Sequence, residues 1–227
     1  MLKNPALKDF LIKSCPIKPL PLKAITLETR LIKLVPLTMQ HLEGYCLAGN
    51  YPQVWQHMPI NRCQSQEIAK PWLAEAIKKM DQGLELAFVI INKVSEKESD
   101  TVIGSTRLFR YNDNDKTIEL GHTFITPDFQ RSHVNSHAKY LMLKHAFEQL
   151  KMVRVEICTH ENNQQSRNAI TRIGGQFEGI LRKHRRAPNG DYRNTALFSI
   201  IDEDWLQVKQ QLLATGKSQE EFMHVPS

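Results

Sequence analysis

A stretch of alternating strands and helices between Thr117 and Gly174 carries the residues whose spacing could do chemistry. Its pieces, in order, are TIELGHTFI, TPDFQRSHVNS, HAKYLMLKHAFEQLKM, VRVEICT, HENNQQ and SRNAITRIGG. A loop that runs from a strand into the start of a helix collects unpaired backbone N–H groups at the positive end of the helix dipole. Such a loop is a ready site for a phosphate or pyrophosphate, so the segment predicts an anion site.

The loop QRSHVNSHAK (130–139) is the first candidate for that site. Its candidate binding residues are Gln130, Arg131, Ser132, His133, Val134, Asn135 and Ser136. The loop lacks glycine, so its side chains restrict φ and crowd the approach of a ligand, although backbone donors remain. His133 and His137 add charge to a phosphate contact if they are protonated. The alternative is an ordinary helix N-terminus with Asn135 or Ser136 as its cap.

The strand 118–125 carries two titratable side chains. Alternation places one set of residues on one face (Ile118, Leu120, His122 and Phe124) and a second set on the other (Glu119, Gly121, Thr123 and Ile125). The interior glycine predicts a bulge or a close approach of another group to the backbone. Glu119 is a candidate site carboxylate, or else a solvated or ion-paired one. His122 is a candidate site histidine, or else one packed in a core-facing position.

Bulk properties narrow the class of protein. The chain has 227 residues, 41% of them hydrophobic, enough for one good core or at most two small ones. No apolar run approaches the roughly 20 residues that span a bilayer, and the basic N-terminus lacks the apolar core of a secretory signal. The four cysteines show no CxxC spacing, which favours reduced thiols in a cytoplasmic protein over disulfides or a metal site. The net charge of +6 suits acidic partners such as nucleotide-like cofactors or ribosomes, or only solubility.

The order of elements predicts a single domain. We expect an N-terminal extension at 1–25 that is partly disordered, a domain at 26–214 and a frayed C-terminal tail at 215–227. Strands are predicted at 29–37, 84–91, 101–110, 118–125 and 153–159, with two more around a turn at 188–191. Helices are predicted after Thr38, at about 65–82, 135–151 and 163–174, and after 202.

Several of these pieces, in this order, resemble the GNAT N-acetyltransferases, in the branch that includes the N-terminal acetyltransferases of bacterial ribosomal proteins. The pieces are TRLIKLVPLT, IGSTRL, IELGHTFITPDFQ, VNSHAKYLMLKHAFE, RVEICT, the Asn163–Ser166 pair, FEGILRKH and DEDW. Together they cover about residues 29–213. The resemblance implies an α/β fold of GNAT (acyl-CoA N-acyltransferase) type, with a mixed, mostly antiparallel central sheet of about six or seven strands flanked by helices.

The resemblance also implies where acetyl-CoA binds. The cofactor would lie between the strand ending near Ile125 and the strand 153–159, with its pyrophosphate on the backbone of the loop at 130–136. The family pattern there is Q/R-x-x-G-x-G/A; Gln130 fits it, whereas Ser132 and His133 stand where glycine is expected. Backbone N–H groups near Phe124 to Thr126 would polarise the thioester carbonyl.

Roles for side chains follow from the same resemblance. An ammonium ion must lose a proton before it attacks a thioester, so the reaction needs a base. Glu119 is the leading candidate, directly or through a water, and His122 is the other. Ser166 would protonate the departing thiolate, and Asn163 would bind the pantetheine arm or simply cap its helix. Arg167 faces either the cofactor's phosphates or solvent.

One feature departs from the family. Some relatives place a glutamate base a few residues after an EG pair, whereas here Glu178–Gly179 is followed by the basic run 182–186 without a carboxylate. That run contacts an acidic substrate, a CoA phosphate or RNA, or it is a solvated face.

The sequence therefore predicts a cytoplasmic N-acetyltransferase. It would pass an acetyl group from acetyl-CoA, by direct attack and without a metal, to a primary amine of a protein N-terminus or small molecule. We expect a monomer or homodimer that binds no membrane and meets nucleic acid only through ribosomes. The alternative is a CoA-binding or ribosome- or RNA-associated protein of the same fold with little or no turnover.

Overall fold

The computed structural model describes residues 22–58, 60–93, 101–186, 190–216 and 218–223. Most of the predicted N-terminal extension, residues 1–21, lies outside the described residues, as do the last four residues of the predicted tail. Leu22, at the end of that extension, is buried and donates its N–H to the carbonyl of Gly83 at 3.0 Å.

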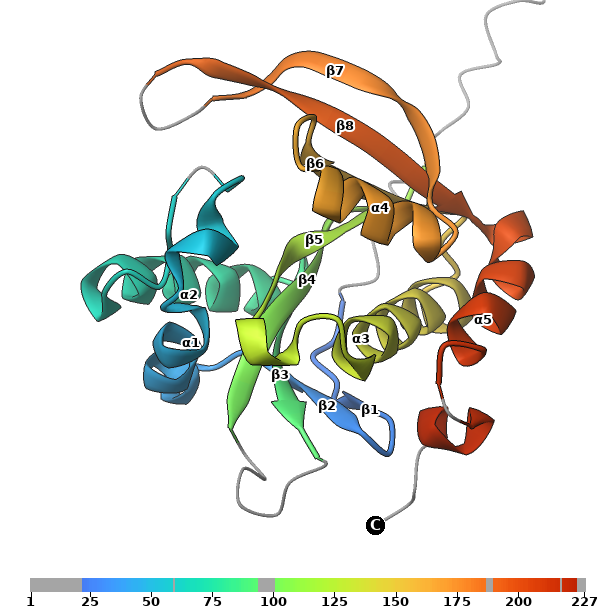
Figure 1. The fold of residues 1–227 in the computed structure, drawn as a ribbon, viewed down its shortest axis with the longest axis horizontal. Helices are drawn as coiled ribbons and strands as arrows, with labels where there is room; N and C mark the ends of the chain where they lie inside the picture. The colour runs from blue at the N-terminus through green and yellow to red at the C-terminus, as the bar shows by residue number, and fades with distance from the viewer. Residues whose placement is uncertain (1–21, 59, 94–100, 187–189, 217, 224–227) are drawn as a thin grey trace, which may run out of the picture.

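Eight strands form one sheet in the order β1-β2-β3-β4-β5-β6-β8-β7 (Figure 1). They are β1 Leu27–Glu28, β2 Ile32–Pro36, β3 Leu86–Asn92, β4 Val102–Asn112, β5 Thr117–Ile125, β6 Arg154–His160, β7 Gln176–Arg186 and β8 Tyr192–Ile201. Only β5 and β6 pair in parallel; every other pairing is antiparallel. The mixed, mostly antiparallel sheet is confirmed, and the strand beyond the predicted six or seven is the two-residue β1.

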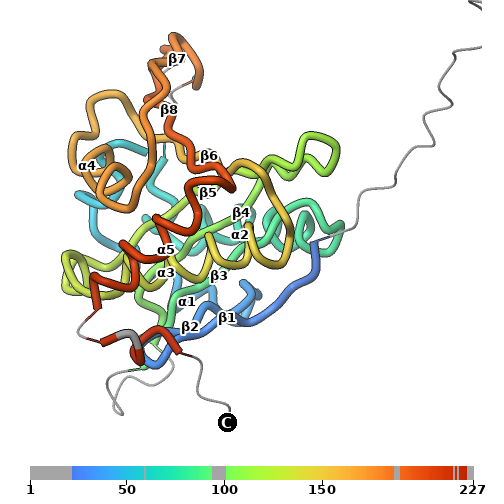
Figure 2. The backbone as a smooth tube through the Cα atoms, turned by 90° about the vertical axis from the view of Figure 1, so that its right-hand side faces the viewer, coloured from blue at the N-terminus to red at the C-terminus, as the bar shows by residue number. Residues whose placement is uncertain are grey.

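Helices cover both faces of the sheet. Helices α1 (Leu42–Gly49) and α2 (Gln66–Asp81) lie on one side of the central strands, and α3 (His133–Lys144), α4 (Gln164–Arg172) and α5 (Trp205–Leu213) lie on the other (Figure 1). The β7–β8 hairpin stands at the end of the molecule opposite β1 and β2 (Figure 2).

Strand β3 shows why the sheet needs two layers of helices. Each of its seven residues is buried. Leu86, Phe88 and Ile90 belong to the core on the α3 face, whereas the alternate residues Ala87, Val89 and Ile91 belong to the core on the α1–α2 face. Because successive side chains point to opposite faces, a strand that is apolar throughout is stable only when both faces are covered.

Helix α3 begins earlier than the sequence predicted. Its N-cap is Ser132, whose Oγ accepts the N–H of Val134 at 3.3 Å, so Asn135 and Ser136 lie inside the helix instead of capping it. The helix continues as a π-helical turn at His145–Gln149. Helix α2 matches its prediction closely, since Ser65 caps it and it ends at Asp81.

A β-bulge in β5 overturns the predicted alternation of that strand. Arg107 on β4 opposes Gly121, yet Ser105 opposes Phe124, so β5 holds one extra residue between these pairs. His122 takes a left-handed conformation there, with φ of +49°. As a result Phe124 packs on the α1–α2 face, opposite to Ile118 and Leu120. The bulge that Gly121 predicted in this strand is confirmed, and its neighbour His122 takes the left-handed conformation there.

Part of the predicted C-terminal tail contacts α3 in the described structure. Residues Gln219–Phe222 form a 3₁₀ turn, and the Phe222 ring stacks on His137 with 3.9 Å between ring centroids. His137 is fully buried and its Nδ1 pairs with the hydroxyl of Thr29 at 2.9 Å. Burial and the neighbouring His133 lower the pKa of His137 to about 4, so the expectation that it adds charge to a phosphate contact is wrong.

Lys139 on α3 is a buried cation in the apolar layer. Its Nζ donates to Thr123 Oγ1 at 3.2 Å, and Thr123 also pairs with the hydroxyl of Thr106 at 2.8 Å. Burial lowers the pKa of Lys139 to about 8. Below that pH the folded protein holds a desolvated charge, which reduces the free energy of unfolding; the reduction fades as the pH rises from about 8 to the ordinary 10.5.

We therefore expect Lys139→Met to stabilise the protein at pH 7 by about 2–3 kcal/mol, and by less at pH 10. Thr123 keeps Thr106 as a partner, so the substitution strands no hydroxyl. Urea denaturation at both pH values measures the effect, with Lys78→Met on the exposed side of α2 as the control. A loss of stability at both pH values would contradict the expectation.

Candidate active site

The site forms where β5 and β6 stop pairing. Their parallel register runs from Thr117 opposite Arg154 to Glu119 opposite Glu156 and goes no further. Because parallel strands end at the same edge of a sheet, the loop from β5 into α3 and the loop from β6 into α4 leave from neighbouring positions. Two helix N-termini thus adjoin the point at which the strands part, and Glu119 is the last residue of β5 that pairs with β6.

Glu119 is buried, with 4% of its side chain exposed, and two arginines hold it. Arg110 of β4 approaches Oε2 at 3.0 Å, and Arg185 of β7 lies 3.4 Å from each carboxylate oxygen. Burial raises the pKa of Glu119, and the two guanidinium groups oppose this rise. The ion-paired alternative is therefore present in the structure, and Glu119 is at the same time a buried carboxylate in the last β5–β6 pair before the strands separate.

Arg110 and Arg185, the two arginines that pair with Glu119, were not assigned to the site from the sequence. Arg185 stood in the basic run 182–186, where the spacing gave no reason to single it out, and nothing marked Arg110. The basic run is thus divided: Arg185 reaches into the site, whereas Arg182 and Lys183 are exposed.

Cys158 on β6 faces the same carboxylate. Burial raises the pKa of its thiol to about 12, and the negative charge of Glu119 adds to the rise. The thiol is therefore protonated at neutral pH and a poor nucleophile.

His122 lies beside Glu119 but is exposed to solvent, so its predicted core-facing position is wrong. Its ring is flanked by Phe109 and Trp72, with centroid distances of 4.6 and 5.1 Å. Burial of part of the ring and the positive charges of Arg107 and Arg185 lower the pKa of His122 below its usual range. The imidazole is thus neutral at pH 7, and the same lowered pKa makes it a weak proton acceptor.

The β5–α3 loop is closed by side chains bonded to its own backbone. Gln130 Nε2 donates to the carbonyl of Ile125 at 3.0 Å, and Ser132 Oγ donates to the carbonyl of Phe129 at 2.6 Å. The left-handed residue of the loop is Arg131, with φ of +57°, whereas Ser132 has φ of −109°. The conformation therefore does not require glycine at position 132. Ser136 Oγ donates to the carbonyl of His133, and Val134 is buried in the core.

One predicted backbone donor is already engaged. The N–H of Thr126 donates to the carbonyl of Ile103 at 2.9 Å, so it does not point at a ligand. Phe124 and Ile125 are both buried and pair with Ser105 and Gly104 of β4.

The loop between β6 and α4 holds the remaining candidates. Asn163 caps α4, since its Oδ1 accepts the N–H of Ser166 at 3.0 Å. The hydroxyl of Ser166 makes no hydrogen bond within the described part of the chain and is partly exposed. Arg167 donates to the carbonyl of Glu161 and stacks on Phe177, so its side chain is held against its own loop and β7.

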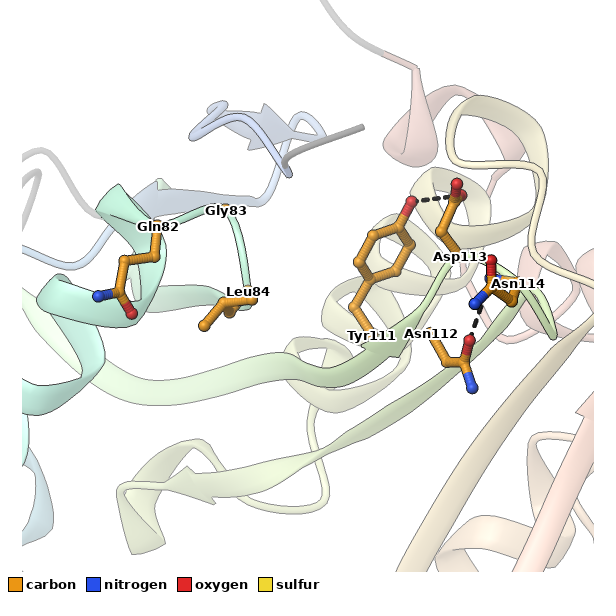
Figure 3. A pocket seen from close by; sticks show the side chains of 7 residues that line it. All are labelled: Gln82, Gly83, Leu84, Tyr111, Asn112, Asp113 and Asn114. Carbon is orange, nitrogen blue, oxygen red and sulfur yellow. Dashed lines mark hydrogen bonds between the residues drawn. The ribbon is translucent and has the colours of Figure 1, made fainter. Parts of the chain in front are cut away.

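A shallow hollow of about 310 Å³ lies elsewhere (Figure 3). It is lined by residues 82–84 after α2 and by residues 111–114, which join β4 to β5. These residues precede β5, whereas the loop at 126–133 follows it, so the hollow lies at the other end of the strand. It is separate from the candidate site.

Among the described residues no group of His, Cys, Asp and Glu side chains could hold a metal ion. Within the same residues, no helix has both the length and the apolar character needed to cross a membrane.

Comparison with known proteins agrees with this geometry. The family pattern described as "Acetyltransferase (GNAT) domain" matches residues 31–176, well over half of the chain. The putative ribosomal N-acetyltransferase YdaF of Bacillus subtilis is 27% identical over 105 residues, which cover 46% of this chain and 56% of that protein. The match thus spans little more than half the length of that curated relative.

Solved structures share the whole fold. A GCN5-related N-acetyltransferase from Brucella melitensis is 27% identical with a TM-score of 0.76, covering 90% of this chain and 95% of its own. RimJ of Mycobacterium smegmatis, solved in complex with CoA-disulfide, is 17% identical with a TM-score of 0.71, covering 87% and 96%. Because RimJ is only 17% identical to this chain, that comparison shows a shared fold alone. Together with the matched pattern, these findings show that the chain belongs to the GNAT acetyltransferase family.

Proposed function

We propose that this protein transfers the acetyl group of acetyl-CoA to a primary amine by direct attack. The observation that carries the proposal is the parting of β5 and β6 after Glu119, beside the N-termini of α3 and α4. The pantetheine arm of acetyl-CoA would enter between the two strands. The pyrophosphate would meet the N–H groups and positive dipole end of α3.

The acceptor would approach from the α1–α2 face, where Glu119 and His122 lie. The amine nitrogen attacks the thioester carbonyl; its C–N bond forms as the C–S bond breaks. Glu119 takes the proton that the amine loses, through a water because the carboxylate is buried. His122, the other candidate base, is the weaker acceptor because its pKa is lowered. The free hydroxyl of Ser166 gives a proton to the departing thiolate.

The acceptor is a protein N-terminus or a small-molecule amine. The name of the Bacillus subtilis relative, a ribosomal N-acetyltransferase, favours an amine of a ribosomal protein, and the two classes of acceptor can be separated by assay. Thiol release from acetyl-CoA is measured against a panel of peptides with free N-termini and of small amines. Calorimetry measures CoA binding in parallel.

Amine-dependent thiol release supports the proposal. CoA binding without release for any amine would instead favour a CoA-binding protein with little or no turnover. Absence of both would reject the proposal.

A further inference from the structure

Trp72 of α2 contacts two arginines on the α1–α2 face. The guanidinium carbons of Arg62 and Arg107 lie 4.4 and 4.3 Å from its ring centroid. Both guanidinium groups are therefore in cation–π contact with the same indole ring. The indole Nε1 donates to the hydroxyl of Tyr45 at 3.3 Å, and the ring edge meets His122. The orientation of Trp72 is therefore fixed by four contacts.

The two arginines differ in how well their charge is compensated. Arg107 is buried and its Nη1 donates to Glu85 at 3.2 Å. Its Nε and Nη2 make no hydrogen bond within the described residues, although the Tyr45 hydroxyl lies nearby. Arg62 is partly exposed, and no described carboxylate forms an ion pair with it. A stacked guanidinium without an anion is a ready partner for a planar carboxylate.

Charges facing His122 from the surrounding elements are mainly positive. Four cations influence it: Arg107 of β4, Arg185 of β7, Arg62 from the segment before α2, and Lys79 of α2. The carboxylates around them already have partners. Glu85 pairs with Arg107, Glu75 with Lys79, and Glu119 with Arg110 and Arg185. Arg62 is the cation of this set that remains without a described carboxylate.

This cluster adjoins the reacting groups. Phe109 stands opposite Glu119 in the β4–β5 register, and its ring contacts His122, which in turn meets Trp72. An acceptor whose amine lies at Glu119 and His122 would therefore extend along Trp72 towards Arg62.

We propose that the acceptor carries a carboxylate a short distance from its reacting amine, and that Arg62, stacked on Trp72, binds this carboxylate. Arg107 supports the site from beneath by holding Trp72 and adding a buried positive charge. The inference rests on the proposed acetyl transfer, because it assigns a substrate class to that site. The carboxylate belongs either to the α-carboxyl group of a small amine or to an acidic side chain near a peptide N-terminus.

Two matched pairs of acceptors distinguish these sources. The first pair is alanine and alaninamide, which differ in the α-carboxylate. The second is Ala-Glu-Ser-Phe-amide and Ala-Gln-Ser-Phe-amide, which differ in the side chain at position two. In the pair whose carboxylate corresponds to that of the true acceptor, kcat/KM for the anionic member should exceed kcat/KM for the neutral member by at least about tenfold.

The variant Arg62→Gln should reduce this ratio to about threefold or less, mainly by raising KM for the anionic acceptor. KM for acetyl-CoA and turnover of the neutral acceptors should stay close to wild type. The matched control is Arg30→Gln, an exposed arginine that pairs with Glu220 near the C-terminal turn. It should preserve the ratio.

The outcomes separate the two proposals. Turnover of amines with no preference for the anionic member of either pair would overturn the carboxylate site and leave acetyl transfer intact. An equal loss for anionic and neutral acceptors in Arg62→Gln would also overturn it, because a merely structural role predicts that pattern.

If no acceptor is turned over, binding decides the question. Calorimetry in the presence of CoA then compares N-acetylalanine and N-acetyl-Ala-Glu-Ser-Phe-amide with their neutral counterparts. Tighter binding of an anionic product that Arg62→Gln abolishes supports the carboxylate site even though acetyl transfer has failed. Equal or absent binding rejects it.

Discussion

Replacement of Glu119 by glutamine is expected to lower kcat by about 100-fold or more, the range typical of a lost general base. Glutamine keeps the size of the side chain and its oxygen near Arg110 and Arg185, but it takes up no proton. CoA affinity should be nearly unchanged, because no part of the proposed pyrophosphate loop is altered. Thiol release with a turned-over acceptor measures the rate.

The pH profile of the wild type provides a second readout of the same carboxylate. Glu119 accepts a proton only when it is ionised, and burial raises its pKa above the ordinary 4.5. The rate should therefore fall as the pH drops through a value above 4.5, and Glu119→Gln should lack this limb.

The control for Glu119→Gln is Glu156→Gln. Glu156 stands opposite Glu119 in the β5–β6 register, is partly exposed and pairs with Arg154. Its replacement should leave kcat within about threefold of wild type. A Glu119→Gln enzyme with near wild-type kcat, or a loss of rate explained by a lower melting temperature, would remove Glu119 from the role of base.

Replacement of His133 by proline is expected to weaken CoA binding by about 10- to 100-fold, the effect of one lost hydrogen bond to a charged group. Proline removes the backbone N–H at the first position of α3 without breaking the helix. Ser132 before it is extended, with φ of −109° and ψ of −170°, which suits a residue that precedes proline. Calorimetry with CoA measures the change.

Two comparisons isolate the backbone group. His133→Ala removes the same side chain but keeps the N–H, so it should bind CoA far better than the proline variant. A short acetyl donor without the diphosphate, S-acetyl-N-acetylcysteamine, should be used equally well by both variants. Equal CoA affinity in the two variants would show that the α3 N-terminus does not hold the pyrophosphate.

Much of the fold followed from local patterns. The apolar run at 84–91 predicted strand β3, and the helical spacing of apolar residues at about 65–82 predicted α2. The register of β5 did not follow, because the bulge at His122 arises from its pairing with β4, and Phe124 changes face as a result.

The sequence by itself determined that a strand runs into a helix N-terminus at 125–133, because that arrangement is local, and it predicted an anion site there. Glu119 and His122 were candidates because they are the titratable side chains of that strand. Only the tertiary structure decided their surroundings. Arg185 reaches Glu119 across 66 residues of sequence, and Arg62 and Arg107 meet at Trp72 from separate segments. Such contacts form when the sheet and its helices pack, so no periodicity or spacing along the chain encodes them.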